Sequence, residues 1–343
     1  MTGRTVLALL AVAIALPGCS GPASSGAGAV TPPAATPAVD VMPGVEPLPQ
    51  WRLGQSWTHA WEIPSQGVAF STEVVVTNAT ASGYQLASDT LEMALFHASF
   101  IFPDLGTMAS DLSGTTQGAF RFPWYSFPLE DGKRWTAVME DLDFQLQPVR
   151  SELTLTATLR ADSPRQVFDI EARDAAGLQA RYDYDPEVGW FTEFFGYEGG
   201  EDPEAWMYRI RLEGHQPDWS GTWYRSEGEL VVQHLNILVP PAGYVQPAVA
   251  TSFQLRPDAT HFMGLLFSFA EGGAHDAQVV APDGTRHHAT VAGGAGIYHA
   301  DGANIVQVEA QPGTYHVSTV GAGAVAAGGG VFGWSHKVSQ GHI

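Results

Sequence analysis

Residues 151–161, with the sequence SELTLTATLRA, decide the fold of this chain. Apolar and polar residues alternate through the segment, and its apolar members are Leu153, Leu155, Ala157 and Leu159. Successive side chains of a β-strand point to opposite faces of a sheet, so a period of two marks a strand with one buried and one hydrated face. The segment therefore predicts a strand of an antiparallel sheet, sandwich or barrel.

The same alternation recurs across the first two thirds of the chain. It is found in residues 68–77, 166–173, 178–184 and 207–212. From Trp51 onward no long stretch has a clean helical period, although residues 90–99 (TLEMALFHAS) are ambiguous and also fit a short helix. We therefore expect an all-β fold that begins with an antiparallel curved sheet or barrel-like domain.

The last third of the chain predicts two hairpins and a closing strand. Residues 278–290 fold back at Ala281-Pro282-Asp283-Gly284, where Pro sets the first corner and Gly the left-handed one. Residues 304–320 fold back at Gln311-Pro312-Gly313, and residues 332–338 form the last strand. Short strands joined by tight turns predict a smaller β-sandwich (jelly-roll-like) domain.

A boundary between these two domains is expected at residues 238–243 (LVPPAG), where two prolines and a glycine interrupt the strands. Residues 46–245 hold 12 Lys and Arg against 29 Asp and Glu, and nine of the ten Trp. Residues 246–343 hold eight of the 12 His. We therefore expect an acidic, aromatic-rich β domain at 51–238 and a His- and Gly-rich β-sandwich domain at 246–340.

The N-terminal residues read as an export signal. Arg4 precedes an apolar run at residues 6–16, which is long enough for a signal peptide and too short to span a bilayer. Leu16-Pro17-Gly18-Cys19 resembles a lipobox, in which the cysteine is lipidated after cleavage, although Pro17 departs from the small or β-branched residue usual there. We expect a lipoprotein signal peptide at 1–18, with Cys19 as the lipidated residue. The alternative is an ordinary signal peptide, in which case the cysteine carries no lipid.

Residues 19–50 fit a tether between that lipidated Cys19 and the folded part. They are rich in Pro, Ala, Ser and Gly and have no periodicity, so they bury too little apolar surface to offset the entropy of ordering them. The expected location is therefore extracytoplasmic, either the cell surface or the periplasm, with a lipid anchor in the membrane.

Two short motifs are similar to those of one group of proteins. Residues 127–135 (FPLEDGKRW) are similar to a "PL..GK.W" segment, and residues 184–191 (YDPEVGWF) to a "Y.PEVGWF" strand entry. Both resemble segments of uncharacterised prokaryotic surface lipoproteins, with archaea as one candidate source. The resemblance implies a lipocalin-like or similar curved-sheet β domain and no assigned activity.

Composition and motifs exclude several functions. The net charge of −20 argues against nucleic acid, because phosphates need a basic face. A single cysteine excludes a disulfide framework and a zinc site of several thiolates. The chain has no G-x-S-x-G elbow, H-E-x-x-H pair or phosphate-binding glycine loop. The sequence therefore predicts no enzyme.

Histidines and aromatic residues supply the candidate sites. Weak candidates for a zinc or copper site are His287, His288, His299, His316 and His336. The alternative is that these are scattered surface residues. Rings of residues 190–197 project to both faces of a strand, and the candidates for lining a ligand cavity are Trp190, Phe191, Phe194, Phe195 and Tyr197. A large aromatic core explains them equally well. Asn78 begins an Asn-Ala-Thr glycosylation sequon.

Two functions follow from the sequence. The first is a lipid-anchored envelope protein that acts as a non-catalytic binding or interaction module, whose partner is an envelope protein, a glycan or an apolar ligand. The alternative is a surface protein that binds metal, or a metal-dependent enzyme, that uses histidines of the second domain.

Overall fold

The structure is a computed structural model that describes residues 45–64, 68–99, 103–142, 148–161, 165–239, 248–268, 275–288, 290–292, 302–321 and 327–343. Cys19, the predicted signal peptide at 1–18, residues 19–44 of the predicted tether, and His299 lie outside the described residues. The described residues form 23 strands and one helix, which confirms the predicted all-β class.

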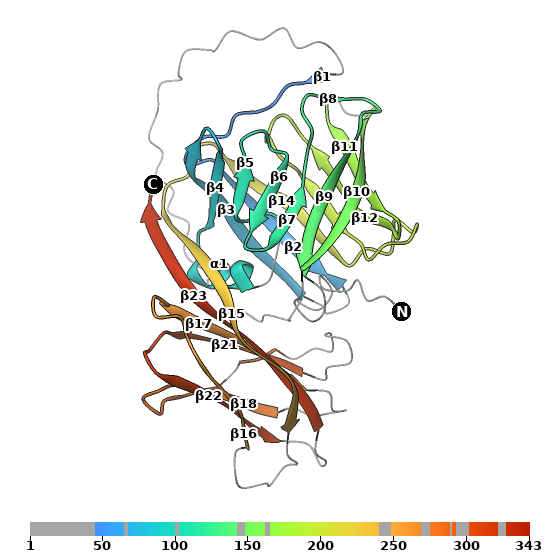
Figure 1. The fold of residues 1–343 in the computed structure, drawn as a ribbon. Coiled ribbons are helices and arrows are strands. Elements are labelled where there is room, and N and C mark those ends of the chain that lie inside the picture. Colours follow the sequence, from blue (N-terminus) through green and yellow to red (C-terminus); the bar gives the residue numbers. More distant parts are fainter. Residues whose placement is uncertain are drawn as a thin grey trace.

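Twelve antiparallel strands form a barrel in which each strand pairs with the next one along the chain. Strand β14 returns to β2 through a ladder from Arg209↔Glu62 to Gln216↔Ser56. Figure 1 shows this barrel in the upper part of the molecule. Its strands are β2 (Ser56–Ile63), β3 (Val68–Thr80), β4 (Gly83–Ser88), β5 (Thr107–Ala109), β6 (Gly114–Gln117), β7 (Phe120–Pro123), β9 (Arg134–Leu142), β10 (Pro148–Leu159), β11 (Phe168–Asp174), β12 (Gly177–Tyr184), β13 (Glu193–Gly196) and β14 (Tyr208–Gln216).

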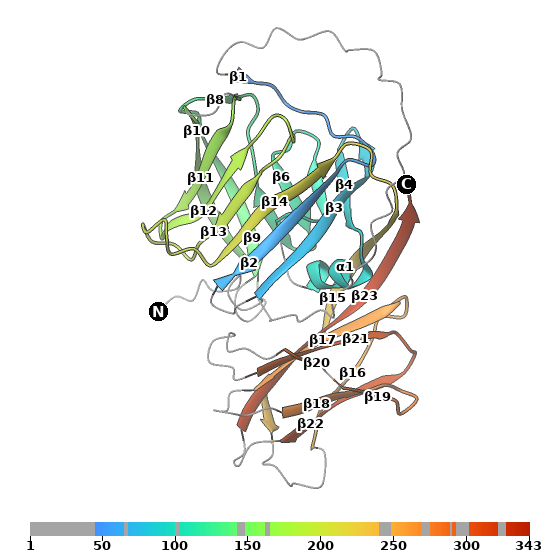
Figure 2. The same cartoon turned by 180° about the vertical axis from the view of Figure 1, so that it is seen from behind.

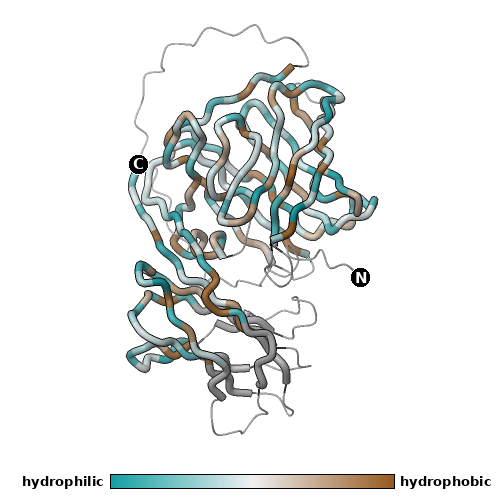
Figure 3. The backbone as a smooth tube through the Cα atoms, in the orientation of Figure 1, coloured by the Kyte–Doolittle hydropathy of each residue, from teal (hydrophilic) through white to brown (hydrophobic). Residues whose placement is uncertain are grey.

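The predicted alternation is the inside–outside pattern of this barrel. In β10, Leu153, Leu155 and Ala157 are fully buried, whereas Glu152 and Thr158 are exposed. The same holds for the alternating segments of β11, β12 and β14, whose apolar members are buried, except Leu212 of β14, which is half-buried. Figure 3 shows the pattern as changes between hydrophilic and hydrophobic colour along the barrel strands. The prediction of an antiparallel barrel-like first domain is confirmed.

Aromatic rings fill the interior of the barrel. Trp57, Trp61, Trp124 and Trp190 have at most 1% of their surface exposed, and their rings contact other aromatic rings of the core. A barrel of twelve strands is wider than the eight-stranded barrels that aliphatic side chains fill, so large rings are needed to close the space. The barrel is therefore a packed core rather than an open channel.

Helix α1 (Leu91–Ser99) covers one end of the barrel, as Figure 2 shows, and it resolves the ambiguous segment as a helix. Met93, Ala94, Leu95 and Phe96 are buried against the core. No helix of the described residues has the length and hydropathy needed to cross a membrane.

The barrel has one weak junction, between β7 and β9. These two strands share a single residue pair, Arg121↔Glu140, supported by an ion pair with 2.6 Å between Arg121 Nε and Glu140 Oε2. On its other side β9 pairs with β10 along its whole length. Between β7 and β9 the chain makes a short excursion, in which β8 (Leu129–Glu130) pairs with β1 (Val45–Glu46). The barrel wall is therefore open beside this pair.

A second unit below the barrel in Figure 1 consists of two sheets. One sheet has the order β16 (Ala248–Gln254), β22 (Thr314–Gly321), β18 (His275–Val280) and β19 (Arg286–His288). The facing sheet has the order β15 (Thr222–Val239), β23 (Ala327–His342), β17 (His261–Ser268), β21 (Gly302–Glu309) and β20 (Thr290–Ala292). Phe253, Phe262 and Tyr315 stack in the core between them. The unit is a β-sandwich.

Strand β15 belongs to this sandwich, although the predicted boundary at 238 places it in the first domain. It pairs with β23 from Thr222↔His342 to Val239↔Ala327, whereas its one pairing with a barrel strand among the described residues is Tyr224↔Ser88. Its core residue Val232 packs in the sandwich.

One of the two predicted hairpins is confirmed and the other is wrong. Strands β18 and β19 pair as predicted around residues 281–284. Strands β21 and β22 do not pair, because β21 lies between β17 and β20 and β22 lies between β16 and β18. The turn at residues 311–313 instead carries the chain from one sheet to the other, so that Val308 and Tyr315 face the same core from opposite sides.

Substitutions on the two faces of β10 should lower the free energy of unfolding by different amounts. Leu155→Ala leaves a cavity in the ring-filled interior, and we expect it to lower the free energy of unfolding by about 2–5 kcal/mol. Thr158→Ala, on the hydrated face, should lower it by less than about 1 kcal/mol. Denaturant titration of both variants measures this, and equal costs would contradict the assignment of faces.

Candidate functional site

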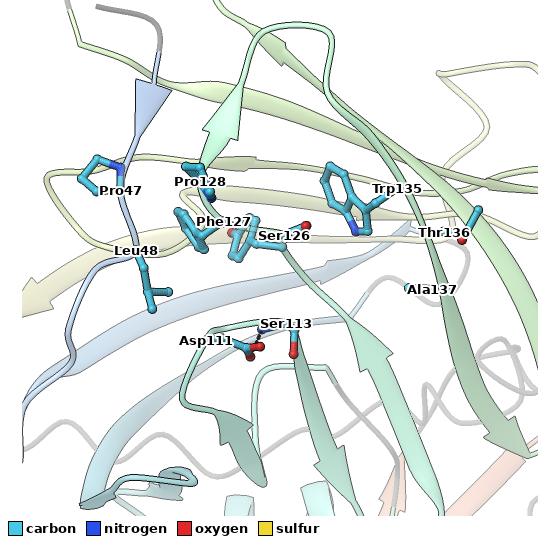
Figure 4. A pocket seen from close by; sticks show the side chains of 11 residues that line it. Pro47, Leu48, Asp111, Ser113, Ser126, Phe127, Pro128, Trp135, Thr136 and Ala137 are labelled. Carbon is cyan, nitrogen blue, oxygen red and sulfur yellow. Dashed lines mark hydrogen bonds between the residues drawn. The ribbon is translucent and has the colours of Figure 1, made fainter. Parts of the chain in front are cut away.

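A cavity of about 580 Å³ opens where β7 and β9 diverge, and we call it the seam pocket. Figure 4 shows it from close by. Four segments that are distant in sequence form its walls, and their lining residues are Pro47 and Leu48 after β1, Asp111 and Ser113 between β5 and β6, Tyr125, Ser126, Phe127 and Pro128 after β7, and Trp135, Thr136 and Ala137 of β9.

Aromatic rings give the seam pocket an apolar surface. In Figure 4, Phe127 and Trp135 lie on different walls and face the space between them. Phe127 packs edge-on against Tyr184, with ring centroids 5.1 Å apart. The Trp135 side chain is partly buried and packs against the barrel core, yet its ring contacts no other aromatic ring and its indole N–H makes no hydrogen bond with the residues that the structure describes. Its ring is therefore held in place with a face left for a ligand.

Polar groups stand at the edge of this apolar surface. The Asp111 carboxylate is exposed and accepts a hydrogen bond of 3.0 Å from the Ser113 N–H. Hydrogen bonding by Ser113 lowers the pKa of Asp111, so the carboxylate is ionised at neutral pH. The hydroxyl groups of Ser126 and Thr136 have no hydrogen-bond partner within the described residues. The pocket thus combines ring faces, one negative charge and two free hydroxyls.

Residues 127–135, on which part of the family resemblance rests, build this pocket. Lys133 Nζ donates to the Ser126 and Pro128 carbonyl oxygens, the latter over 2.7 Å. Gly132 turns the chain with a φ of 75°, which suits glycine. The turn brings Trp135 to the wall opposite Phe127. The motif itself was visible in the sequence, but nothing local in it indicated a cavity.

The second motif, residues 184–191, has a structural role. Its carbonyl groups at Val188 and Gly189 accept hydrogen bonds from the indole N–H groups of Trp57 and Trp51, over 3.0 and 2.9 Å. Asp185 pairs with Trp190 in an isolated bridge that closes the turn. The motif therefore fixes this loop to the aromatic core.

The aromatic residues predicted to line a ligand cavity lie elsewhere. Trp190, Phe191 and Phe194 are fully buried in the barrel core, and Tyr197 is 3% exposed. Phe195 lies on the outer face, where the guanidinium groups of Arg181 and Arg209 stack on its ring at 4.9 and 5.5 Å. None of the five lines the seam pocket.

The predicted metal candidates are not brought together. His287 is partly exposed in β19, His288 is in the same strand with a side chain outside the described set, and His316 Nδ1 lies 2.7 Å from the Ser252 hydroxyl in the same sheet. His336 is in the other sheet, on β23. Within the described ranges, no group of three His, Cys, Asp or Glu side chains is arranged to hold a metal ion.

His336 is instead the centre of a hydrogen-bond chain. Its Nδ1 lies 2.8 Å from the Ser226 hydroxyl and its Nε2 lies 3.0 Å from the Ser99 hydroxyl. The Ser99 hydroxyl donates to the Leu95 carbonyl oxygen over 2.9 Å, so His336 Nε2–H donates to Ser99 and Nδ1 accepts from Ser226. This chain connects helix α1 to β15 and β23, and both ring nitrogens are occupied.

Sequence reasoning missed a buried charged cluster at the helix end of the barrel. Asp104 lies between His59 and His97, with N···O distances of 3.4 and 3.5 Å, and all three side chains are fully buried. Burial lowers the pKa of His97, opposed by the nearby Asp104 carboxylate. Since the three side chains lie on β2, on α1 and after α1, their interaction fixes the helix to the barrel wall.

A second cavity, of about 470 Å³, lies between the barrel, the end of α1 and β15. Its lining includes Ser99 and Ser226, whose hydroxyls are held by His336. Arg225 and Glu227, 3.4 Å apart, lie at its edge. These four side chains are engaged in hydrogen bonds or an ion pair, whereas Gln117 Oε1, also in the lining, is buried and has no hydrogen-bond partner within the described residues.

Asn78, the candidate glycosylation site, is exposed on β3 next to a bulge between Val76 and Asn78.

Comparison with known proteins identifies no family for this chain. No family model and no curated protein matches it. Among solved structures it is similar to the VP2 subviral particle of infectious bursal disease virus, with 10% identity over 87% of this chain and 78% of that chain, at a TM-score of 0.24. Another, described as containing a xylogluco-oligosaccharide, is 9% identical over 85% of this chain and 95% of that chain, at a TM-score of 0.18. Scores this low carry no argument about function.

The His336 chain predicts a loss of stability in acid. Burial, with a smaller effect of His261, lowers the pKa of His336 to about 3. Because histidine in the unfolded chain has a pKa of about 6.5, the unfolded state binds more protons between these values, and the free energy of unfolding falls as the pH falls through that window. We expect a loss of about 3 kcal/mol from this group between pH 7 and pH 4, measured by urea titration.

His336→Gln isolates this contribution. The variant should be less stable than the wild type at pH 7, and the difference should shrink toward pH 4 because the substituted residue does not titrate. A difference of the same size at both pH values would contradict the assignment.

Proposed function

We propose that this protein is a non-catalytic binding module of the cell envelope and that its ligand binds in the seam pocket. The observation that carries the proposal is Trp135, a partly buried ring that packs against the barrel core, lines the pocket, and has no aromatic or hydrogen-bond partner for its side chain within the described part of the chain. An unpaired indole face beside hydroxyls and a carboxylate is a typical recognition surface for an amphipathic ligand.

The size and chemistry of the pocket support binding rather than catalysis. Its volume of about 580 Å³ lies in the range of small-ligand sites. Of its lining residues, Asp111 is the one carboxylate, and no histidine stands beside it. General acid–base chemistry needs a second group within reach of the reacting atoms. Tyr125 is the other ionisable lining residue. Its hydroxyl already donates to the Asp183 carbonyl oxygen over 2.8 Å, so this proton is not available to a ligand.

The proposed location is extracytoplasmic, with Cys19 as the lipid-bearing residue. Support comes from the apolar run at residues 6–16 and the lipobox-like sequence that ends at Cys19. Strand β1 pairs with β8, and the next residues, Pro47 and Leu48, line the seam pocket. A tether from Cys19 would therefore reach the folded part beside the ligand site. Prokaryotic lipoproteins with similar motifs are the proposed relatives.

Trp135→Ala tests the ligand site. We expect the variant to lose at least about tenfold in affinity for any ligand found by thermal-shift screening of glycans, peptides and lipids, because an aromatic contact of this kind contributes about 1–2 kcal/mol or more. Trp206→Ala, which removes a partly buried ring remote from the pocket, is the matched control. Unchanged affinity in the Trp135 variant would refute the assignment of the site.

Cys19→Ser tests the anchor. Without the thiol no lipid can be attached, so the variant should appear in the soluble fraction or the medium, whereas the wild type partitions with membranes. Fractionation of cells that express both proteins, with detection by immunoblot, measures this. Equal membrane retention of the two proteins would show that Cys19 carries no anchor.

A further inference from the structure

We propose that the ligand of the seam pocket is an extended polypeptide segment that adds to the open edge of β9. This inference rests on the proposed function, because it names the ligand class of the same site. It depends on the main chain of β9 as well as on the side chains of the pocket.

Strand β9 has a free edge. It pairs with β10 from Arg134↔Thr156 to Leu142↔Pro148. Toward β7 it has one partner, at Glu140. Beyond that pair, the main chain of Arg134 and Thr136 on that side makes no hydrogen bond to the segment that follows β7, among the residues that the structure describes, and this part of β9 borders the seam pocket. Free strand edges bind extended chains because their N–H and C=O groups are spaced for a further strand.

The direction of the free groups follows from the ladder with β10. The Ala157 N–H donates to the Lys133 carbonyl oxygen over 2.9 Å, so the next residue of β9 points its N–H and C=O away from β10. Alternation then gives the same outward direction to Arg134, Thr136 and Val138. Glu140 has the same parity and is the residue that pairs with Arg121 of β7, which agrees with this assignment.

The side chains around this edge determine which residue types fit at each position of an added strand. Side chains of an added strand would point alternately inward and outward. Inward ones meet Trp135 and Phe127 in the seam pocket, which suits an aromatic or branched apolar residue. Outward ones lie beside Val138, which is 42% exposed and one of three large exposed apolar residues of the described structure. A segment with apolar residues at every second position fits both.

Charge selects a basic segment and disfavours a second copy of this chain. The protein carries a net charge of −20, and the seam pocket is charged only by Asp111. Pairing of two β9 edges would bring two strongly acidic barrels together, whereas Lys or Arg in the added segment would be attracted. A glycan would use the ring faces but would not need the N–H and C=O groups of the edge.

Thr136→Pro and Thr136→Ala distinguish these modes. Both remove the Thr136 hydroxyl, but only proline removes the outward N–H, and this N–H makes no bond to β10. The probe is a library of random decapeptides displayed on phage and selected against the full chain, followed by affinity measurement on synthetic peptides. We expect peptides with alternating apolar residues and a net positive charge. Their affinity should fall at least about tenfold in Thr136→Pro and by less than about threefold in Thr136→Ala.

Hydrogen exchange by NMR provides a test that needs no variant. In the free protein the amides of Arg134 and Thr136 should exchange faster than those of Trp135, Ala137 and Met139, which face β10. A selected peptide should slow the first set. Absence of both effects would overturn the proposed pairing.

The remaining outcomes separate this inference from the proposed function. If Trp135→Ala weakens binding of a ligand while Thr136→Pro does not, the pocket binds by side chains alone, and the strand-addition proposal is wrong although the pocket remains the site. If selection yields no peptide but a glycan array yields a Trp135-dependent ligand, the conclusion is the same. If Thr136→Pro instead dissociates a dimer in sedimentation experiments, the partner is a second copy and the proposal is wrong.

Discussion

The closure of a twelve-stranded meander is the constraint on which the rest of this structure depends. A barrel needs two ends of a curled sheet to meet in register. Strand β14 meets β2 through a continuous ladder, but the ring of strands is completed between β7 and β9 by the pair Arg121↔Glu140 alone. Both of these side chains reach solvent, so their ion pair adds little stability. The wall is held closed mainly by the packed rings inside it, and the opening beside the pair becomes the seam pocket.

The two ends of the barrel differ in their physical character. At the helix end, fully buried His59, His97 and Asp104 hold α1 against the wall. Polar groups buried this close together restrict orientation, because their mutual attraction is stronger in a medium of low dielectric constant. At the other end lie the two-residue strand β1 and the seam pocket. There the rings of Phe127 and Trp135 and main-chain groups of β9 are accessible. Rigidity at one end and exposure at the other are suited to binding without large rearrangement.

The sequence predicted the strands well because their pattern is local. Alternation in residues 151–161 is produced by one strand with two environments, and the structure confirms it. The seam pocket could not be predicted, because Leu48, Asp111, Phe127 and Trp135 meet only through the register of a closed barrel. The predicted metal site failed for the same reason, because contacts between histidines depend on how the strands are arranged. Those of the last third are close in sequence but divided between two sheets, whereas His59 and His97 meet across the barrel. The turn at 311–313 shows the related limit, since a tight turn serves a hairpin and a crossing between sheets equally well.

An open strand edge is a liability in a soluble domain, because it offers the same groups to a second copy as to a partner. Short strands, proline and charge are the usual protections. Here Pro123 ends β7 beside the opening. The charge of the barrel region, with 12 basic against 29 acidic residues over 46–245, adds a long-range protection, because it repels copies of the same chain. Repulsion of this kind leaves a basic segment free to approach, so the feature that keeps the edge from pairing with itself also sets the charge of the partner it accepts.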